Sequence, residues 1–195
     1  MEAIDREGGS GVLFPVYGAA DQGSRSRSTY FPVEILMEEA KRERRKAILG
    51  QDEATIDGKG RLLLAKKKRE RLGEGFVIAL GEIGCLCAYP AEVWEEMLDT
   101  IYSYESINIG RQMYSRMVLG SAEDELDCDE QGRVVVPTKL RKLAGLEKDV
   151  ILLGCGDRLE IWDRQEFAKY EANPTAYGQS RRETLQQALD TMKGR

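Results

Sequence analysis

The sequence contains no histidine, so the side chain that most often acts as a general base near neutral pH is absent. Serine or cysteine nucleophiles activated by histidine are therefore excluded within this chain. There is also no glycine-rich phosphate loop ending in Gly-Lys-Ser or Gly-Lys-Thr. Carboxylate, lysine or tyrosine chemistry stays open, but no convergent cluster of such residues is visible. We expect no enzymatic activity.

Metal-binding patterns are also missing. The four cysteines, Cys85, Cys87, Cys128 and Cys155, include no C-x-x-C pair, and no histidine can complete a zinc knuckle. Cys85 and Cys87 are two residues apart, a spacing that places both on one face of a strand. We expect no metal and no cofactor. The four thiols are interpreted as reduced and mostly buried, acting as small apolar residues.

Long apolar runs are absent, and none approaches the ~18 residues that a membrane helix needs. The first residues, MEAIDREGGSG, lack the basic-then-apolar order of a signal peptide. These absences favour a cytoplasmic protein without a membrane partner. The net charge of −5 argues against a protein that is basic over its whole surface. It does not exclude nucleic-acid binding, because a local basic patch is sufficient.

An internal repeat organises the chain from residue 50 onwards. Each copy has a turn, a strand, a short basic helix, two strands and a further helix. The first copy has strands at 61–64, 76–80 and 85–89 and helices at 66–72 and 91–102. The second has strands at 134–136, 150–153 and 159–162, with helices at 139–144, where Thr138 is the expected N-cap, and from the Asp163 cap to about 171. Four residues fall 72 positions before their counterparts: Asp57, Gly60, Arg61 and Arg69 precede Asp129, Gly132, Arg133 and Arg141.

The remaining segments are less informative. Residues 1–32 are rich in glycine and serine, and we expect them to be loosely structured. A helix is predicted at 33–48, and its basic run at 41–46 fits either a solvated face or an extra DNA or partner contact. Helices are also predicted at 109–121 and 179–192, the latter with an apolar stripe that favours docking. Trp94 and Trp162 are candidates for packing in the core or between subunits, and the core is favoured.

The motif with the clearest chemistry is Asp-x-x-Gly-Arg, which occurs as DGKGR at 57–61 and DEQGR at 129–133. Aspartate opens tight turns by accepting backbone N–H groups, and glycine adopts the positive φ that other residues resist. The arginine then stands at the start of the returning strand, where an Asp–Arg pair would fix its orientation. A fixed guanidinium suits guanine edges or phosphates. One such turn alone would be a structural hairpin, but two copies followed by basic helices favour DNA binding.

The basic helices complete the candidate site. The first copy brings Lys66, Lys67, Lys68, Arg69 and Arg71, and the second, less basic, brings Lys139, Arg141 and Lys142. The candidate DNA-binding residues are Lys59, Arg61, Lys66, Lys67, Arg69, Arg133, Lys139 and Arg141, and the turn-forming residues are Asp57, Gly60, Asp129 and Gly132.

From Gly50 to about Phe167 the sequence resembles the MraZ family. The matching residues are DGKGRL at 57–62, Arg69, CLCAYP at 85–90, Trp94, Arg116, ELD at 125–127, DEQGR at 129–133, Pro137, Leu140 and Arg141, AGLEKDV at 144–150, Gly154 and LEIWD at 159–163. Ala65 departs from this pattern, because the first repeat of the family usually has proline there.

The resemblance implies an α+β fold in which two swapped-hairpin, AbrB-like half-domains interlock as a pseudo-two-fold β-barrel with flanking helices. The corresponding regions are an N-terminal extension at 1–49, a first domain at 50–97, a helical connector at 98–121, a second domain at 122–168 and a helical tail at 169–195.

The resemblance also implies a function. Members of the family are repressors that bind direct repeats in double-stranded DNA upstream of their own cell-division and cell-wall gene cluster. They associate with the nucleoid and form homo-oligomeric rings. The alternative is a ring-forming interaction scaffold without operator specificity, which the acidic net charge, Ala65 and the N-terminal extension favour slightly.

Overall fold

The computed structural model describes residues 47–194, and the repeat predicted from the sequence is confirmed in it. The first copy consists of β1 (Ile48–Thr55), β2 (Arg61–Leu63), α2 (Lys66–Leu72), β3 (Phe76–Leu80), β4 (Leu86–Tyr89) and α3 (Ala91–Tyr102). The second copy consists of β5 (Glu123–Leu126), β6 (Arg133–Val135), α5 (Thr138–Leu143), β7 (Asp149–Gly156), β8 (Leu159–Asp163) and α6 (Arg164–Ala172). Helix α4 (Ile109–Met117) and the 3-10 turn η1 (Leu119–Ser121) connect the copies, and α7 (Gln179–Met192) follows the second.

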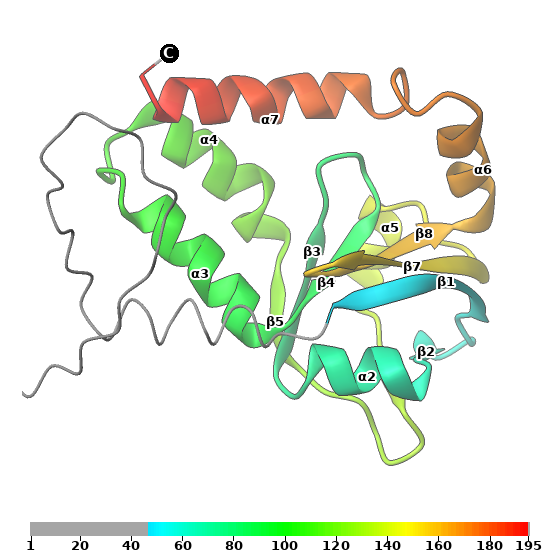
Figure 1. The fold of residues 1–195 in the computed structure, drawn as a ribbon. Coiled ribbons are helices and arrows are strands. Elements are labelled where there is room, and N and C mark those ends of the chain that lie inside the picture. The colour runs from blue at the N-terminus through cyan, green and yellow to red at the C-terminus, as the bar shows by residue number, and fades with distance from the viewer. Residues whose placement is uncertain (1–46, 195) are drawn as a thin grey trace, which may run out of the picture. The chain divides into compact units, whose positions relative to one another are not determined.

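The two repeats exchange strands. β1 pairs antiparallel with β7 along its whole length, and β5 pairs with β3. β4 and β8 pair with each other and so join the strands of both repeats into one sheet. This six-stranded sheet has the order β1-β7-β8-β4-β3-β5 (Figure 1). β2 and β6 form a separate two-stranded ribbon. The pairings are symmetric: the first strand of each repeat pairs with a strand of the other repeat, β1 with β7 and β5 with β3. Each repeat therefore completes the sheet of the other.

The α+β class follows from this sheet and the helices around it. The closed barrel that the resemblance implies is not found: across residues 47–194 the main sheet is open, with β1 and β5 at its edges. Within the same residues, the ribbon is not hydrogen-bonded into the main sheet and forms a second, smaller sheet.

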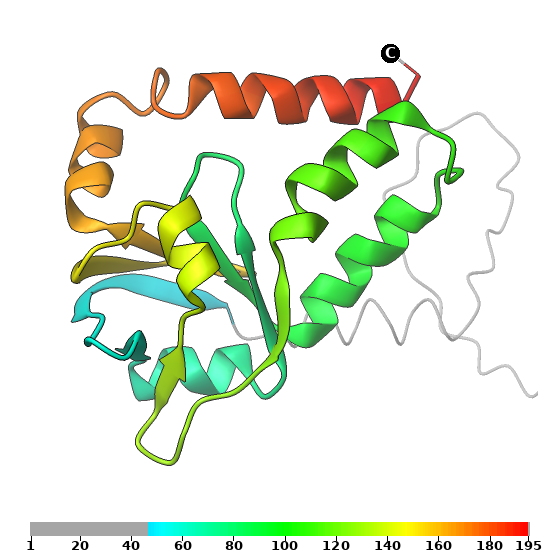
Figure 2. The same ribbon diagram turned by 180° about the vertical axis from the view of Figure 1, so that it is seen from behind.

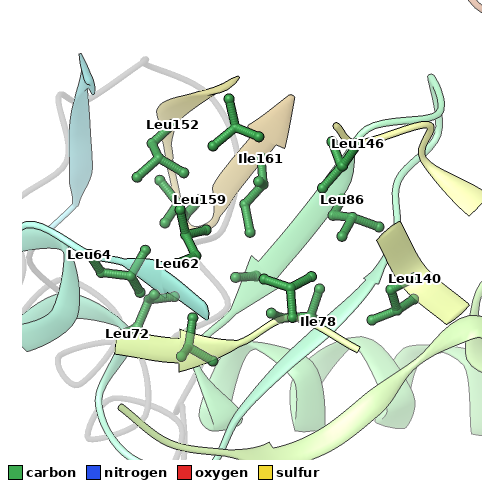
Figure 3. Close-up of a cluster of buried hydrophobic side chains, with 14 of the residues drawn as sticks. Leu62, Leu64, Leu72, Ile78, Leu86, Leu140, Leu146, Leu152, Leu159 and Ile161 are labelled. Atoms are coloured by element: carbon green, nitrogen blue, oxygen red, sulfur yellow. The ribbon is translucent and has the colours of Figure 1, made fainter. Parts of the chain in front are cut away.

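The main core joins the sheet to the ribbon and to the short helices α2 and α5. Leu62 enters it from the ribbon, Leu72 from α2 and Leu140 from α5 (Figure 3). Val134 of the ribbon joins them, and all four are buried. Side chains alternate between the two faces of a strand. Because position 62 faces the core, positions 61 and 63 face away from it. These positions therefore mark the side of the ribbon that faces solvent.

Two further clusters cover the rest of the sheet. Trp94 of α3 packs among α4, α7 and the outer face of β3, and Trp162 of β8 packs against Phe167. Both tryptophans are buried, as predicted. Helix α7 lies along α4 (Figure 2) and meets it at Gly110, where an added Cβ would be 2.3 Å from the Ala188 carbonyl oxygen. Only glycine permits this approach of the two backbones.

Most predicted elements are present, but several boundaries were wrong. The helix predicted at 33–48 lies outside the described residues except for its last two, of which Ile48 begins β1. Thr138 is the first residue of α5, not its N-cap, and the cap position belongs to Pro137. The helix predicted at 109–121 ends at Met117 and continues as the η1 turn. Asp163 does cap α6, because its side chain accepts from the backbone N–H of Gln165 and Glu166.

Candidate nucleic-acid interface

The first D-x-x-G-R turn is organised by the carboxylate of Asp57. Oδ1 accepts the backbone N–H of Lys59 at 2.8 Å and that of Arg61 at 2.9 Å, while Oδ2 accepts Nε of Arg61 at 2.7 Å. These donors, with the Arg61 backbone N–H contributing most, lower the pKa of Asp57 from 3.8 to about 2. The ionised carboxylate therefore holds both the turn and the guanidinium, as the sequence predicts.

The second turn repeats this arrangement around Asp129. Its Oδ1 accepts the backbone N–H of Gln131 at 3.0 Å and that of Arg133 at 2.9 Å, and Oδ2 accepts Nε of Arg133 at 2.9 Å. The backbone N–H of Arg133, followed by its side chain, again lowers the pKa of Asp129. Nη2 of Arg133 also lies 2.8 Å from Oδ2.

The glycine of each turn has the backbone angle expected for it. Gly60 has a φ of 80° and Gly132 a φ of 81°, a region that residues with a Cβ rarely adopt. The two turns are also connected through the backbone. Leu64 N–H donates to the Gly132 carbonyl at 3.0 Å, and Val136 N–H donates to the Gly60 carbonyl at 2.9 Å.

The ribbon brings the two arginines together on one surface. Arg61 of β2 is directly opposite Val135 of β6, and Leu63 is directly opposite Arg133. These four side chains make up the outward face of the ribbon, which we call the ribbon face. Leu63 is 56% exposed and Val135 is 55% exposed, so each guanidinium stands beside an uncovered aliphatic side chain. Neither aliphatic residue was predicted from the sequence as part of the site, although their alternation with buried Leu62 and Val134 could have identified them.

Exposed lysines lie on the turn and the helices next to the ribbon. Lys59 lies in the first turn, Lys66 and Lys67 lie at the start of α2, and Lys139 lies at the start of α5. The Lys139 ammonium donates to the Gly120 carbonyl at 3.2 Å, and Lys66 lies 3.8 Å from Glu70. Such weak surface contacts leave an ammonium group available to a phosphate.

One lysine of the basic helix does not belong to this surface. Lys68 is only 4% exposed, and its ammonium donates to Asp52 at 2.7 Å and to the Gly50 carbonyl at 3.0 Å. It therefore joins α2 to β1, and the expectation that it adds to the basic patch was wrong. Its partners are 16 and 18 residues away, and only the packing of α2 on β1 brings them close.

Ala65 has the same backbone conformation as Pro137, its counterpart in the second repeat. Its φ and ψ are −57° and 140°, and those of Pro137 at the equivalent position are −55° and 140°. Proline fixes φ close to this value, so the chain passes from ribbon to helix with the same backbone geometry in both repeats, with or without a proline.

The structure also gathers Cys85, Cys87 and Glu160, whose ligand atoms lie within 4.8 Å of one another. Both carboxylate oxygens of Glu160 already accept hydrogen bonds, Oε1 from Arg158 and Oε2 from Trp162. Hydrogen bonding to Cys87 and burial raise the pKa of the Cys85 thiol, which favours its protonated form. We assign these residues to the hydrogen-bonded core.

Comparison with known proteins identifies the family. A family model described as MraZ protein, putative antitoxin-like, matches residues 47–117 and again residues 119–191. The chain belongs to the MraZ family. The two matches of the family model correspond to the two halves that exchange strands in the fold.

Relatives in the MraZ family are similar to this chain over most of their own length. A transcriptional regulator MraZ from Heliobacterium modesticaldum is 39% identical over 122 residues, which are 63% of this chain and 85% of the relative. One from Thermoanaerobacter sp. is 37% identical over 126 residues, 65% of this chain and 87% of the relative. One from Acetivibrio thermocellus is 34% identical over 131 residues, 67% and 91% respectively. These relatives are named as regulators of transcription and not as enzymes.

No helix among residues 47–194 is both long enough and apolar enough to cross a membrane.

Proposed function

We propose that this protein regulates transcription by binding double-stranded DNA through the ribbon face. The observation that carries the proposal is the pairing of β2 with β6, which places Arg61 and Arg133, each fixed by its own aspartate, on one exposed surface. The printed names of the relatives, transcriptional regulator MraZ, support the same conclusion.

A two-stranded ribbon with arginines on its outward face is suited to the major groove. That groove admits a two-stranded β-ribbon, and a bidentate arginine contact to O6 and N7 of guanine is the commonest specific contact found there. Arg61 is bonded to Asp57 through Nε, and Arg133 contacts Asp129 through Nε and Nη2, so the N–H groups of each guanidinium that its aspartate leaves free are the ones assigned to DNA. Leu63 and Val135 add apolar groups beside the arginines, and such groups contact the methyl of thymine.

The lysines around the ribbon face are assigned to the DNA backbone. Lys59, Lys66, Lys67 and Lys139 are exposed and stand on elements next to the ribbon. Phosphate contacts of this kind orient a protein on the duplex without distinguishing sequences. The net charge of −5 then limits attraction to DNA elsewhere on the surface.

The finer features of the proposal come from the family resemblance. We propose that the two domains at 50–97 and 122–168 form an AbrB-type swapped-hairpin unit, and the exchange of β1 and β5 between repeats supports this. The connector at 98–121 and the tail at 169–195 then serve as packing elements. The proposed target is a set of direct repeats upstream of the protein's own cell-division and cell-wall gene cluster, bound by a cytoplasmic, nucleoid-associated ring of subunits that acts as a repressor.

A ring-forming scaffold without operator specificity is the second candidate. The observation in its favour is a group of exposed apolar side chains where α3 leads into α4, namely Tyr102, Ile107 and Ile109. They come from a different part of the chain from the ribbon, so protein contacts there and DNA contacts on the ribbon face are separable by mutation.

Footprinting on the DNA upstream of the protein's own gene tests the proposal. We expect protection at regularly spaced repeats at a protein concentration that leaves a scrambled duplex unprotected. Binding is also expected to weaken steeply with added salt, because phosphate contacts release counterions. Equal protection of the native and scrambled duplexes, or none of either, would reject the regulator and favour the scaffold.

A further inference from the structure

Two arginine–glycine contacts cross between the repeats. Arg69 of α2, in the first repeat, lies against Gly132 in the second turn, where an added Cβ would be 2.1 Å from Nη1 and 2.7 Å from Cζ. Arg141 of α5, in the second repeat, lies against Gly60 in the first turn, where the same distances are 3.0 Å from Nη2 and 3.2 Å from Cζ. Each guanidinium therefore occupies the space that a side chain would need on the glycine of the opposite repeat.

Neither arginine is placed like an open phosphate contact. Both are half-buried, whereas Lys66 and Lys67 on α2 and Lys142 on α5 are exposed. Arg141 donates from Nε to the Val136 carbonyl at 3.1 Å and from Nη2 to the Thr138 hydroxyl at 3.0 Å. Arg69 also lies close to Cys128, just before the second turn. Burial raises the pKa of the Cys128 thiol, and the positive charge of Arg69 opposes this rise.

We infer that Arg69 and Arg141 are positioning residues, each of which holds the DNA-contacting turn of the opposite repeat. Arg141 supports the turn that carries Arg61, and Arg69 supports the turn that carries Arg133. A guanidinium packed against the glycine limits the movement of a turn that is otherwise exposed to solvent. The inference rests on the proposed function only in assigning the two turns to DNA, because the contacts themselves are part of the fold.

A crossed set of double variants tests the inference. Arg→Lys keeps the positive charge and removes the planar group, so a lysine retains attraction to phosphate but cannot fill the space that the guanidinium occupies at the glycine. We expect Arg141→Lys to weaken binding to the protected upstream duplex by about tenfold. In an Arg61→Ala background it should cause almost no further loss, and in an Arg133→Ala background the whole loss should remain. Arg69→Lys is expected to show the reverse dependence.

Lys67→Ala is the matched control for a phosphate contact. Its loss of affinity should come with a decrease of about one in the slope of log K against log salt, whereas Arg141→Lys should leave that slope unchanged. If losses for Arg141→Lys are equal in both alanine backgrounds, or if its salt slope decreases as in Lys67→Ala, the two arginines are DNA contacts and the inference fails.

Hydrogen exchange provides a test that needs no DNA. Arg141→Lys should accelerate exchange of the backbone amides of Gly60 and Arg61, which donate within the first turn, and leave those of Gly132 and Arg133 at the wild-type rate. Arg69→Lys should do the opposite. Equal acceleration in both turns would indicate that the variant destabilises the protein generally. No acceleration in either turn would indicate that the arginine does not hold the turn. Either result overturns the inference. If selective DNA binding is absent while this crossed exchange pattern is present, the proposed function fails and the positioning role stands.

Discussion

Asp57 and Asp129 each hold a turn together and fix the orientation of the arginine in that turn. Each aspartate uses one oxygen for two backbone N–H groups and the other for a guanidinium. This geometry was predictable from sequence, because all its partners lie within four residues of the aspartate. The Lys68–Asp52 ion pair was not predictable, because it depends on how α2 packs against β1.

The titration of Asp57 checks this account at the residue scale. Its pKa in the folded protein, about 2, is below its ordinary value of 3.8, so its stabilising contribution is fully present above pH 3.8 and is lost as the pH falls through about 2. We expect the carboxyl carbon resonance of Asp57 to titrate near pH 2. DNA affinity should be insensitive to this group between about pH 5 and pH 8, where it stays ionised. A midpoint at the ordinary value would show that the turn does not hold the carboxylate.

At the scale of elements, the ribbon is the feature that sequence patterns described least completely. The strands at 61–64 and 134–136 were predicted separately, but their pairing with each other follows from the crossed connections of the two repeats. β1 was missed because Ile48 is its only buried residue and its pairing with β7 is made by the backbone, so its apolar signal is weak. β5 was missed for the same reason, since its sequence, EDEL, carries a single apolar residue.

The exposed aliphatic side chains of the ribbon give a prediction at this scale. Replacing thymine by deoxyuridine in the bound site removes only a methyl group. If Leu63 or Val135 contacts that methyl, at least one such replacement should weaken wild-type binding by about fourfold, the effect of one buried methyl-sized group. The variant that removes the contacting side chain, Leu63→Ser or Val135→Ser, should then no longer distinguish thymine from deoxyuridine at that position.

Gel-shift titrations on duplexes that differ at one thymine measure this effect, and Leu143→Ser, which changes an exposed leucine outside the ribbon face, is the matched control. Wild-type affinity that does not respond to deoxyuridine at any thymine would show that these side chains do not contribute to sequence recognition.

At the scale of the whole molecule, the exchange of strands makes the two repeats one folding unit. β1 needs β7 and β5 needs β3, so a chain that stops after η1 leaves β1 without its partner strand and the core without Leu140, Leu152 and Leu159. The repeat itself was predictable from the 72-residue offset between its two copies. The open sheet was not, because strand order depends on contacts between distant segments.

A fragment of residues 47–121 tests this interdependence. As a monomer it should show no cooperative thermal transition by circular dichroism, since a half-domain buries too little apolar surface to fold alone. Co-expression with residues 122–194 should restore the transition. A cooperative transition in the fragment, with a monomeric mass by light scattering, would show that the first repeat folds by itself.

We propose that Arg61 and Arg133 on the ribbon face distinguish DNA sequences. The most direct measurement is the ratio of affinities for the upstream duplex and a scrambled duplex, determined for the wild type, Arg61→Ala and Arg133→Ala at one salt concentration. We predict that each variant lowers this ratio by about tenfold or more. Affinity for the upstream duplex itself should fall further for Arg61→Ala than for Arg133→Ala, because the surroundings of Arg61 are more basic. Ratios equal to that of the wild type in both variants would contradict the account.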